Sequence, residues 1–191
     1  MNEFKADIEE IRRRARTKLE EGPITASYQA DRTKVIEVLN EVLATEIVCT
    51  LRYKNHYFMA QGIHSQSVAD EFLEHANEEQ QHADMVAKRI TELGGMPNLD
   101  PDGLRTRSHA EYKACDNLQD MIREDLIAER IAVSTYSEIV RWLGNDDPTT
   151  RRMIEEILAK EEEHADDLAK LMTQLGVNPD ANGNGKPAAK S

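Results

Sequence analysis

Apolar residues recur every three or four positions through four long segments of the chain, a spacing that predicts four α-helices. The predicted helices span about Arg32 to Gln61, Ser67 to Leu93, Asn117 to Leu143 and Thr149 to Leu175. Glycine follows three of them, at Gly94, Gly144 and Gly176, as is common at helix ends. These patterns predict an all-α protein.

The connections between the predicted helices differ in length. Only a few residues join the first helix to the second and the third to the fourth, which makes the members of each pair antiparallel neighbours. Residues 95–115 join the second helix to the third, and this segment is long enough to run the length of a bundle. We therefore expect residues 31–176 to form an antiparallel four-helix bundle with one long crossover.

The two ends of the chain differ from this bundle. We expect residues 1–30 to hold a short N-terminal helix, over residues 4–19, and a linker that begins at Gly22-Pro23. The helix has an apolar stripe, which favours docking on the bundle or on a neighbouring subunit: Phe4, Ile8, Ile11, Ala15 and Leu19. Residues 177–191 are polar and rich in glycine, so we expect a disordered tail.

Six ionisable residues interrupt the apolar stripes, at positions that should face the core. They are Glu46, Glu79, His82, Glu129, Glu161 and His164. An unpaired charge is costly to bury, and no lysine or arginine stands at a matching stripe position to neutralise these groups. A divalent metal would do so, and carboxylate together with imidazole favours iron or manganese.

The spacing of these residues repeats in the two halves of the chain. Glu46 precedes Glu79 by 33 residues, and Glu129 precedes Glu161 by 32. Both halves contain a Glu-x-x-His pair, whose members lie on one helix face, and the sixteen residues that begin at each pair share nine identities. Four glutamates and two histidines from four helices are the ligand set already described for helical di-iron sites. We therefore predict two metal ions, each held by one glutamate and one histidine and bridged by two further glutamates.

Glu129 has acidic neighbours, Glu124 and Asp125. We select Glu129 because only its spacing to the last glutamate matches the spacing in the first half. A single Glu-x-x-His pair would indicate no more than a solvated helix face. Two such pairs within apolar stripes, each at a similar distance from a further glutamate, favour a metal site.

Composition narrows the possible partners and location. The chain has 36 acidic and 24 basic residues and a net charge of −12, which argues against a nucleic-acid partner and suits a protein that binds cations. No apolar run approaches the roughly 18 residues of a membrane helix. The first residues alternate in charge and do not resemble a signal peptide. With only two cysteines, Cys49 and Cys115, we expect a cytoplasmic protein without a disulfide framework.

Three segments resemble the bacterioferritin branch of the ferritin-like proteins: LNEVLATEIVCTLRY at 39–53, EQQHADMVAKRITELGGMPNL at 79–99 and EEEHADDL at 161–168. The resemblance covers about residues 31–176 and implies the same six metal ligands. It also implies that Fe(II) is oxidised at this site and that the ferric product is stored in a hollow homo-oligomeric shell. The family has a tyrosine beside the site, and Tyr53 matches it. We assign Tyr53 a catalytic role as an electron donor, with a packed core aromatic as the alternative.

The chain departs from bacterioferritins in three respects. A haem-ligating methionine follows the second-helix glutamate in that family, whereas this chain has Gln80, which argues against haem. The chain also lacks a predicted fifth helix and adds the N-terminal one, so a 24-subunit shell, a smaller Dps-like shell and a dimer all stay open. The basic residues near the N-terminus could form a DNA-binding arm, but interleaved acidic residues favour a solvated helix face.

The function that these features favour is that of a di-iron ferroxidase that uses O2 or H2O2, with two iron ions per subunit, although manganese would also fit. A rubrerythrin-like peroxidase is an alternative, weakened by the lack of a four-cysteine rubredoxin module. A dimanganese catalase without a storage shell is another. The non-enzymatic alternative is a structural helical bundle, or an encapsulated cargo protein, whose core charges form only polar networks.

Overall fold

The computed structural model describes residues 5–60 and 65–177, and this part of the chain contains helices and no strand. Its four long helices are α2 (Arg32–Met59), α3 (Ser65–Glu92), α5 (Leu118–Leu143) and α6 (Pro148–Gln174). The all-α prediction is confirmed, and the bounds of these helices lie within two residues of those predicted. No helix among the described residues is both long and apolar enough to span a membrane.

Polar side chains begin three of these helices at the positions where the sequence provides caps. The Asp31 carboxylate accepts hydrogen bonds from the backbone amides of Thr33 and Lys34 at 3.1 and 3.2 Å. Asn117 caps α5, and Asp147 caps α6 directly before a proline. Such caps satisfy amides that the first helical turn leaves without partners.

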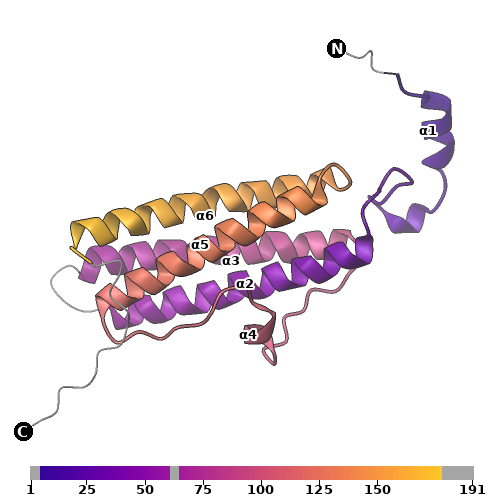
Figure 1. Ribbon diagram of the computed structural model, residues 1–191. Helices are drawn as coiled ribbons and strands as arrows, with labels where there is room; N and C mark the ends of the chain where they lie inside the picture. Colours follow the sequence, from indigo (N-terminus) through magenta and orange to yellow (C-terminus); the bar gives the residue numbers. More distant parts are fainter. Residues whose placement is uncertain (1–4, 61–64, 178–191) are drawn as a thin grey trace, which may run out of the picture.

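The helices form two antiparallel hairpins, α2 with α3 and α5 with α6, which pack side by side (Figure 1). The long connection returns along α2 through the short helix α4 (Leu104–Arg107), so that α5 starts at the end of the bundle where α3 also starts. The predicted antiparallel bundle with one long crossover is therefore confirmed.

Apolar side chains fill the bundle on both sides of its middle. One buried cluster lies toward the start of α2 and includes Val35, Leu39 and Ile154. The other lies toward the end of α2 and includes Phe72 and Leu168. The level between the two clusters is occupied by buried ionisable side chains, which form the site described below.

A buried polar network ties the crossover to the second of these ends. The Arg52 guanidinium donates to Asp125 Oδ1 at 2.8 Å and to the backbone carbonyl of Glu111 at 3.0 Å. The His56 ring lies 2.8 Å from Asp125 Oδ2 through Nδ1 and 3.0 Å from the Lys113 carbonyl through Nε2. Two carbonyls of the crossover are thus bound by side chains that are themselves fully buried.

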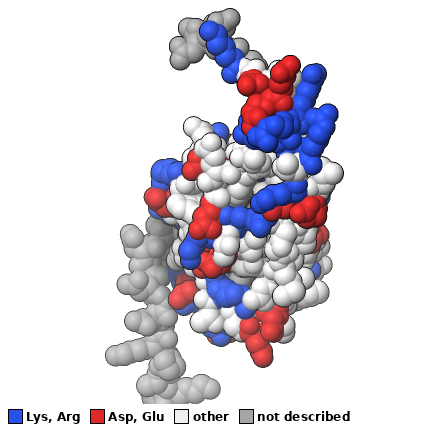
Figure 2. All heavy atoms as spheres, turned by 90° about the vertical axis from the view of Figure 1, so that its right-hand side faces the viewer, with Lys and Arg blue, Asp and Glu red and all other residues white. Residues whose placement is uncertain are grey.

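The N-terminal segment differs from its prediction. The helix α1 covers only Ile8–Arg14, because the backbone turns after Ala15 and Lys18 adopts a left-handed conformation (φ 53°) that breaks the stripe before Leu19. Ile8 and Ile11 are 50% and 44% exposed, so this helix does not dock on the bundle of its own chain. Figure 2 shows this segment standing off the end of the bundle with side chains of both charges. Phe4 and the predicted disordered tail from residue 178 onward lie outside the described residues.

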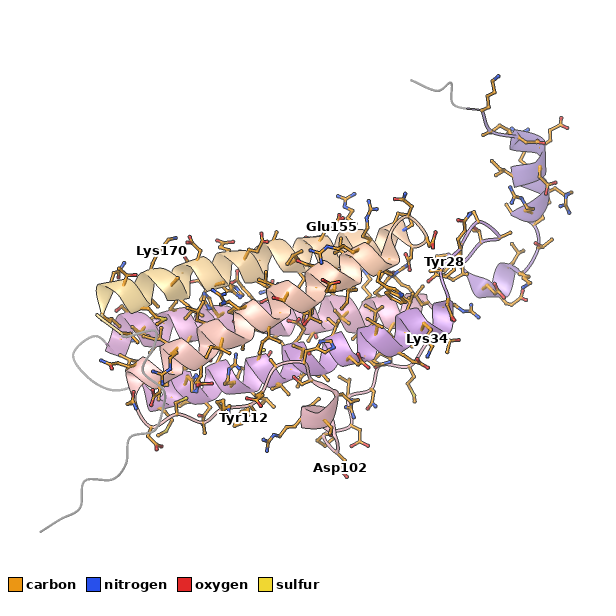
Figure 3. The ribbon with its side chains drawn as sticks, in the orientation of Figure 1. Tyr28, Lys34, Asp102, Tyr112, Glu155 and Lys170 are labelled. Atoms are coloured by element: carbon orange, nitrogen blue, oxygen red, sulfur yellow. The ribbon has the colours of Figure 1, made fainter. Side chains whose placement is uncertain are left out.

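The linker after α1 is nevertheless fixed to the bundle. A short 3-10 helix (Leu19–Glu21) leads to Tyr28, whose hydroxyl donates to Asp147 Oδ2 at 3.0 Å (Figure 3). Arg89 donates to the same carboxylate from the end of α3, at 3.0 Å to Oδ1. Tyr28 therefore joins the linker to both hairpins.

Candidate metal centre

Each of the four long helices places one glutamate at the same level in the middle of the bundle. The six predicted site residues come together there, and each is buried: Glu46, Glu79, His82, Glu129, Glu161 and His164. The four glutamates are each 1% exposed. The sequence repeat explains this convergence, because antiparallel hairpins bring residues at equal spacing to equal height.

These side chains form two groups of possible ligand atoms, each with all atoms within 4.8 Å of one another. One group contains Glu46 and His82, and the other contains Glu129 and His164. Glu79 and Glu161 belong to both groups. The arrangement has the form expected of two metal positions that share two bridging carboxylates.

Both imidazoles point their Nδ1 atoms at the shared carboxylates. His82 Nδ1 lies 3.0 Å from Glu161 Oε1 and 3.3 Å from Glu46 Oε2. His164 Nδ1 lies 3.3 Å from Glu79 Oε1 and 3.7 Å from Glu161 Oε2. On the outer side of the second ring, His164 Nε2 lies 2.7 Å from a carboxylate oxygen of Glu78. Such an outer partner fixes which ring nitrogen is free to bind a metal.

Several atoms of this cluster are buried and have no hydrogen-bond partner. They are Glu46 Oε2, Glu79 Oε1, Glu161 Oε1, His82 Nδ1 and His164 Nδ1. Buried polar atoms are seldom left unpaired, and these five face one another in the cluster. Carboxylate oxygens and imidazole nitrogens at these positions fit a pair of divalent transition-metal ions.

Two buried tyrosines reach across the cluster from one half of the bundle to the other. The Tyr53 hydroxyl donates to Glu129 Oε1, and the Tyr136 hydroxyl donates to Glu46 Oε1. Each tyrosine follows the glutamate of its own helix by seven residues, but it binds the glutamate of the opposite helix. The site therefore has the pseudo-twofold symmetry that the sequence repeat predicts.

Burial and mutual repulsion control the protonation of the cluster. Burial, followed by the charges of neighbouring carboxylates, raises the pKa of Glu46 and Glu129 well above the ordinary value. Burial opposes protonation of His164, but the adjacent carboxylates of Glu161 and Glu79 outweigh it and raise the pKa to about 11. The pKa of His82 is raised in the same way. Burial also opposes ionisation of Glu79, but both imidazoles outweigh it and lower its pKa. Metal ions would replace these protons.

The structure adds polar residues that the sequence did not assign to the site. His75, one turn before Glu79, stacks on the His164 ring with centroids 4.0 Å apart, and its Nδ1 lies 3.2 Å from the Tyr53 hydroxyl. Burial, followed by the nearby His164, lowers the pKa of His75 to about 4. Its position in the stripe of α3 was visible in the sequence, but a packed histidine gives the same pattern. Glu78 gave no signal, because it belongs to a run of acidic residues.

Other candidates have structural partners or lie on the surface. Asp125 is buried but pairs with Arg52 and His56, one turn from Glu129, rather than with the cluster. Gln80 lies exposed on α3, where its amide donates to Asp84 at 3.1 Å. Cys49 is buried and Cys115 half-buried, and both are free thiols.

Fold and site together define a helical bundle whose core is lined by a doubled carboxylate–imidazole cluster. Residues 36–177 match the family model of the ferritin-like domain. The chain therefore belongs to the ferritin-like family, as the three sequence segments predicted.

Relatives fall in two named branches of this family. A nutrient stress-induced DNA-binding protein of Synechococcus sp. is 31% identical over 73% of this chain and 81% of its own length. A bacterioferritin of Brucella melitensis is 30% identical over 81% of this chain and 94% of its own length. Among solved structures, the dodecameric thioferritin of Bacteroides fragilis, a bacterioferritin-related protein, is 32% identical with a TM-score of 0.75, over 78% of this chain and 89% of that one. The resemblance to bacterioferritin-like and Dps-like proteins is thus confirmed.

Proposed function

We propose that this protein is a ferroxidase that binds two Fe(II) ions per chain, oxidises them to Fe(III) with O2 or H2O2, and stores the product. The observation that carries the proposal is the pair of overlapping ligand groups that share Glu79 and Glu161. Two ions held by common carboxylates can lose one electron each to one oxidant molecule.

The charge of the cluster suits this substrate. Four carboxylates bring four negative charges, and two Fe(II) ions bring four positive charges, so a deprotonated cluster is neutral when it is loaded. Oxidation adds two positive charges among carboxylate oxygens in a buried setting, where opposite charges attract strongly. The anionic ligands therefore stabilise Fe(III) more than Fe(II), which favours oxidation.

The electrons and protons balance for either oxidant. Two Fe(II) and one O2 with two protons give two Fe(III) and one H2O2. With H2O2 as oxidant, two Fe(II), one H2O2 and two protons give two Fe(III) and two water molecules. Buried apolar clusters on both sides of the site limit the access of water to the reacting ions.

We assign Tyr53 the role of an additional electron donor beside this site. Its hydroxyl contacts the terminal ligand Glu129, and His75 lies on the other side of the same oxygen. A phenol in this position can give up an electron to a nearby oxidant and its proton to a hydrogen-bonded neighbour. The alternative, a purely structural aromatic, predicts that removal of the hydroxyl leaves oxidation unchanged.

We further propose that the chain assembles as a closed homo-oligomer in the cytoplasm and stores ferric product inside. The solved relative from B. fragilis is dodecameric, which supports a shell of that size. The Synechococcus relative is named as a DNA-binding protein, but the net charge of −12 argues against DNA as a partner of this chain. Its proposed partners are Fe(II), the oxidant and further copies of itself.

The test combines binding, turnover and particle size on the same preparation. Anaerobic titration should give two Fe(II) per chain at the cluster, and addition of O2 or H2O2 should oxidise both. Aerobic loading followed by size-exclusion chromatography should give one large particle with many iron ions per subunit. A small particle that consumes H2O2 with no iron retained would indicate a peroxidase, H2O2 disproportionation with manganese would indicate a catalase, and no metal binding would indicate a structural bundle.

A further inference from the structure

A cavity of about 480 Å³ opens between α3 and α6, beside the cluster. Carboxylates surround it, and the buried rings of His75 and His164 form part of its wall. His164 is one of the six cluster residues, so the cavity reaches from the protein surface to the edge of the site. We therefore consider this cavity as the place where metal ions could enter the cluster.

Three residues within the cavity form a ligand group that shares no member with the six cluster residues. Glu71 and His75 lie one turn apart on α3, and Asp167 faces them from α6. Each offers one ligand atom, and these atoms all lie within 4.8 Å of one another. Two carboxylates and an imidazole suit Fe(II), Mn(II) and similar divalent ions.

The hydrogen bonds of His75 leave one of its ring nitrogens without a proton, and the lone pair of this nitrogen faces the ligand group. The single phenolic proton of Tyr53 goes to Glu129, so the Tyr53 oxygen can only accept from His75 Nδ1. A neutral imidazole carries one N–H, so Nε2 has none. Nε2 nevertheless lies 3.4 Å from a carboxylate oxygen of Glu71. Two acceptors cannot bond each other, whereas a cation bound between them would satisfy both.

The lysines around the cavity leave this group accessible. Lys160 binds Glu78 and Glu163, at 3.3 and 2.7 Å, so those carboxylates already have a cation. Lys170 lies 3.0 Å from Asp167 but 2.6 Å from Asp166, and its side chain is 58% exposed (Figure 3). It can therefore keep Asp166 as its partner while Asp167 binds a metal ion.

His75 also connects this group to the cluster. It forms a second group of possible ligands with Glu129 and His164, in which all three residues are buried. The same imidazole thus lies between the cavity and one of the two metal positions. The outer group and the cluster residues Glu129 and His164 are therefore connected through one shared imidazole.

We propose that Glu71, His75 and Asp167 form a third, outer site for a divalent cation, from which Fe(II) is loaded into the cluster. The role in loading rests on the proposed ferroxidase function, whereas cation binding at the outer site does not. The outer site is expected to bind more weakly than the cluster, because it has three protein ligands and is open to water.

The test counts metal ions without any turnover. Equilibrium dialysis against Co(II) should give three ions per chain in the native protein and two in the double variant Glu71→Gln/Asp167→Asn. The matched control Glu74→Gln/Glu163→Gln removes two other carboxylates that line the same cavity and should keep three. The proposal is overturned if the native protein and the double variant bind equal numbers, or if the control loses as much as the double variant.

Two further measurements separate this site from the cluster. In Glu161→Gln, which removes a shared cluster ligand, the Co(II) ion that depends on Glu71 and Asp167 should remain, and its loss would count against an independent outer site. With limiting Fe(II), the double variant should load the cluster about tenfold more slowly but to the same final extent. If the cluster itself binds no metal, the ferroxidase proposal fails while the outer Co(II) ion still reports on this site.

Discussion

The two hairpins contribute matching ligands to the cluster but surround them differently. Tyr53, bound to the glutamate of α5, has the imidazole of His75 on its other side and lies near the acidic cavity. Tyr136 makes the equivalent bond to Glu46, but the position that corresponds to His75 is occupied there by the apolar residue Ile157. Ile157 stands four residues before Glu161, just as His75 stands four residues before Glu79.

The buried ion pair of Arg52 with Asp125 also has no counterpart in the repeat. Arg52 lies six residues after Glu46, and the residue six after Glu129 is Thr135, which forms no corresponding pair in the described structure. The comparison shows which features require symmetry. The two proposed metal positions need matching ligands, whereas the proposed uptake of metal and the binding of the crossover each need a polar route on one side only.

The largest effect should come from the buried pair of Arg52 with Asp125, because the position equivalent to Arg52 in the repeat holds no charge. Arg52→Ala leaves Asp125 charged and buried, which should lower the free energy of unfolding by roughly 3–5 kcal/mol. Thr135→Ala, at the equivalent position of the other half, should cost less than about 1 kcal/mol. Urea denaturation of the two metal-free variants provides the measurement. Equal losses would show that the two halves depend on their polar residues alike.

Loss of either shared ligand should have the same effect on oxidation, whichever half of the chain the ligand comes from. Glu79→Gln and Glu161→Gln each remove a ligand of both metal positions, so each should lower the rate of Fe(II) oxidation by about 100-fold or more. Glu46→Gln removes a ligand of one position only and should retain binding at the other. Anaerobic Fe(II) titration and stopped-flow absorbance measure both quantities. If Glu79→Gln retained full binding at one position, the carboxylate would not be shared.

The tyrosines offer a smaller but sharper comparison. Tyr53→Phe should slow oxidation about tenfold, which corresponds to roughly 1.4 kcal/mol in the barrier. It removes a hydroxyl that can pass its proton to Glu129 while its oxygen keeps the hydrogen bond from His75. Tyr136→Phe should slow oxidation less than twofold, because the described residues place no imidazole beside its hydroxyl. Single-turnover kinetics on both variants test this difference, and melting temperatures control for lost packing. Equal rates in the two variants would favour a structural role for both rings.

The smallest effect concerns the pH dependence of the metal-free protein. Glu46 and Glu129 have raised pKa values, so the folded protein binds more protons than the unfolded chain once the pH exceeds their ordinary value of 4.5. His164 acts in the same direction between its ordinary pKa of 6.5 and its raised pKa of about 11. Stability should therefore fall as the pH rises from about 5 to 9. The lowered pKa of Glu79 acts only below 4.5. The lowered pKa of His75, about 4, opposes the trend between 4 and 6.5 but is outnumbered by the groups with raised pKa values.

Neutral substitutes should reduce this slope. Glu46→Gln and Glu129→Gln should each raise the metal-free melting temperature at pH 8 by about 2–4 °C, because each removes one of several repelling carboxylates. Saturating metal should reverse the order, since it binds only the folded, deprotonated site. Thermal melts from pH 5 to 9 with and without metal measure both trends. A destabilised Glu129→Gln variant would mean that Tyr53 requires a carboxylate partner.

The symmetric part of this molecule could be predicted from its sequence. Helical spacing predicted the four long helices, and the near-equal intervals between glutamates predicted that Glu46 and Glu129 would meet their partners at one level. The unsymmetric part could not be predicted in this way. The pairing of Arg52 with Asp125 joins residues 73 positions apart with no repeat to relate them. The predicted N-terminal helix was too long, because an apolar stripe does not reveal a left-handed turn at Lys18.

The binding of the crossover also has a consequence for how the chain folds. Each hairpin brings together residues that are close in sequence, so the two hairpins can form early and independently. Their association must close the loop of the crossover, which costs chain entropy before any contact between hairpins is gained. Arg52 and His56 of α2 hold the carbonyls of Glu111 and Lys113 and also bind Asp125 of α5, so this polar network is complete only after the hairpins meet. The ligand cluster also takes residues from both hairpins, so it is complete only once they associate, and binding of the proposed metal ions would report correct assembly of the two halves.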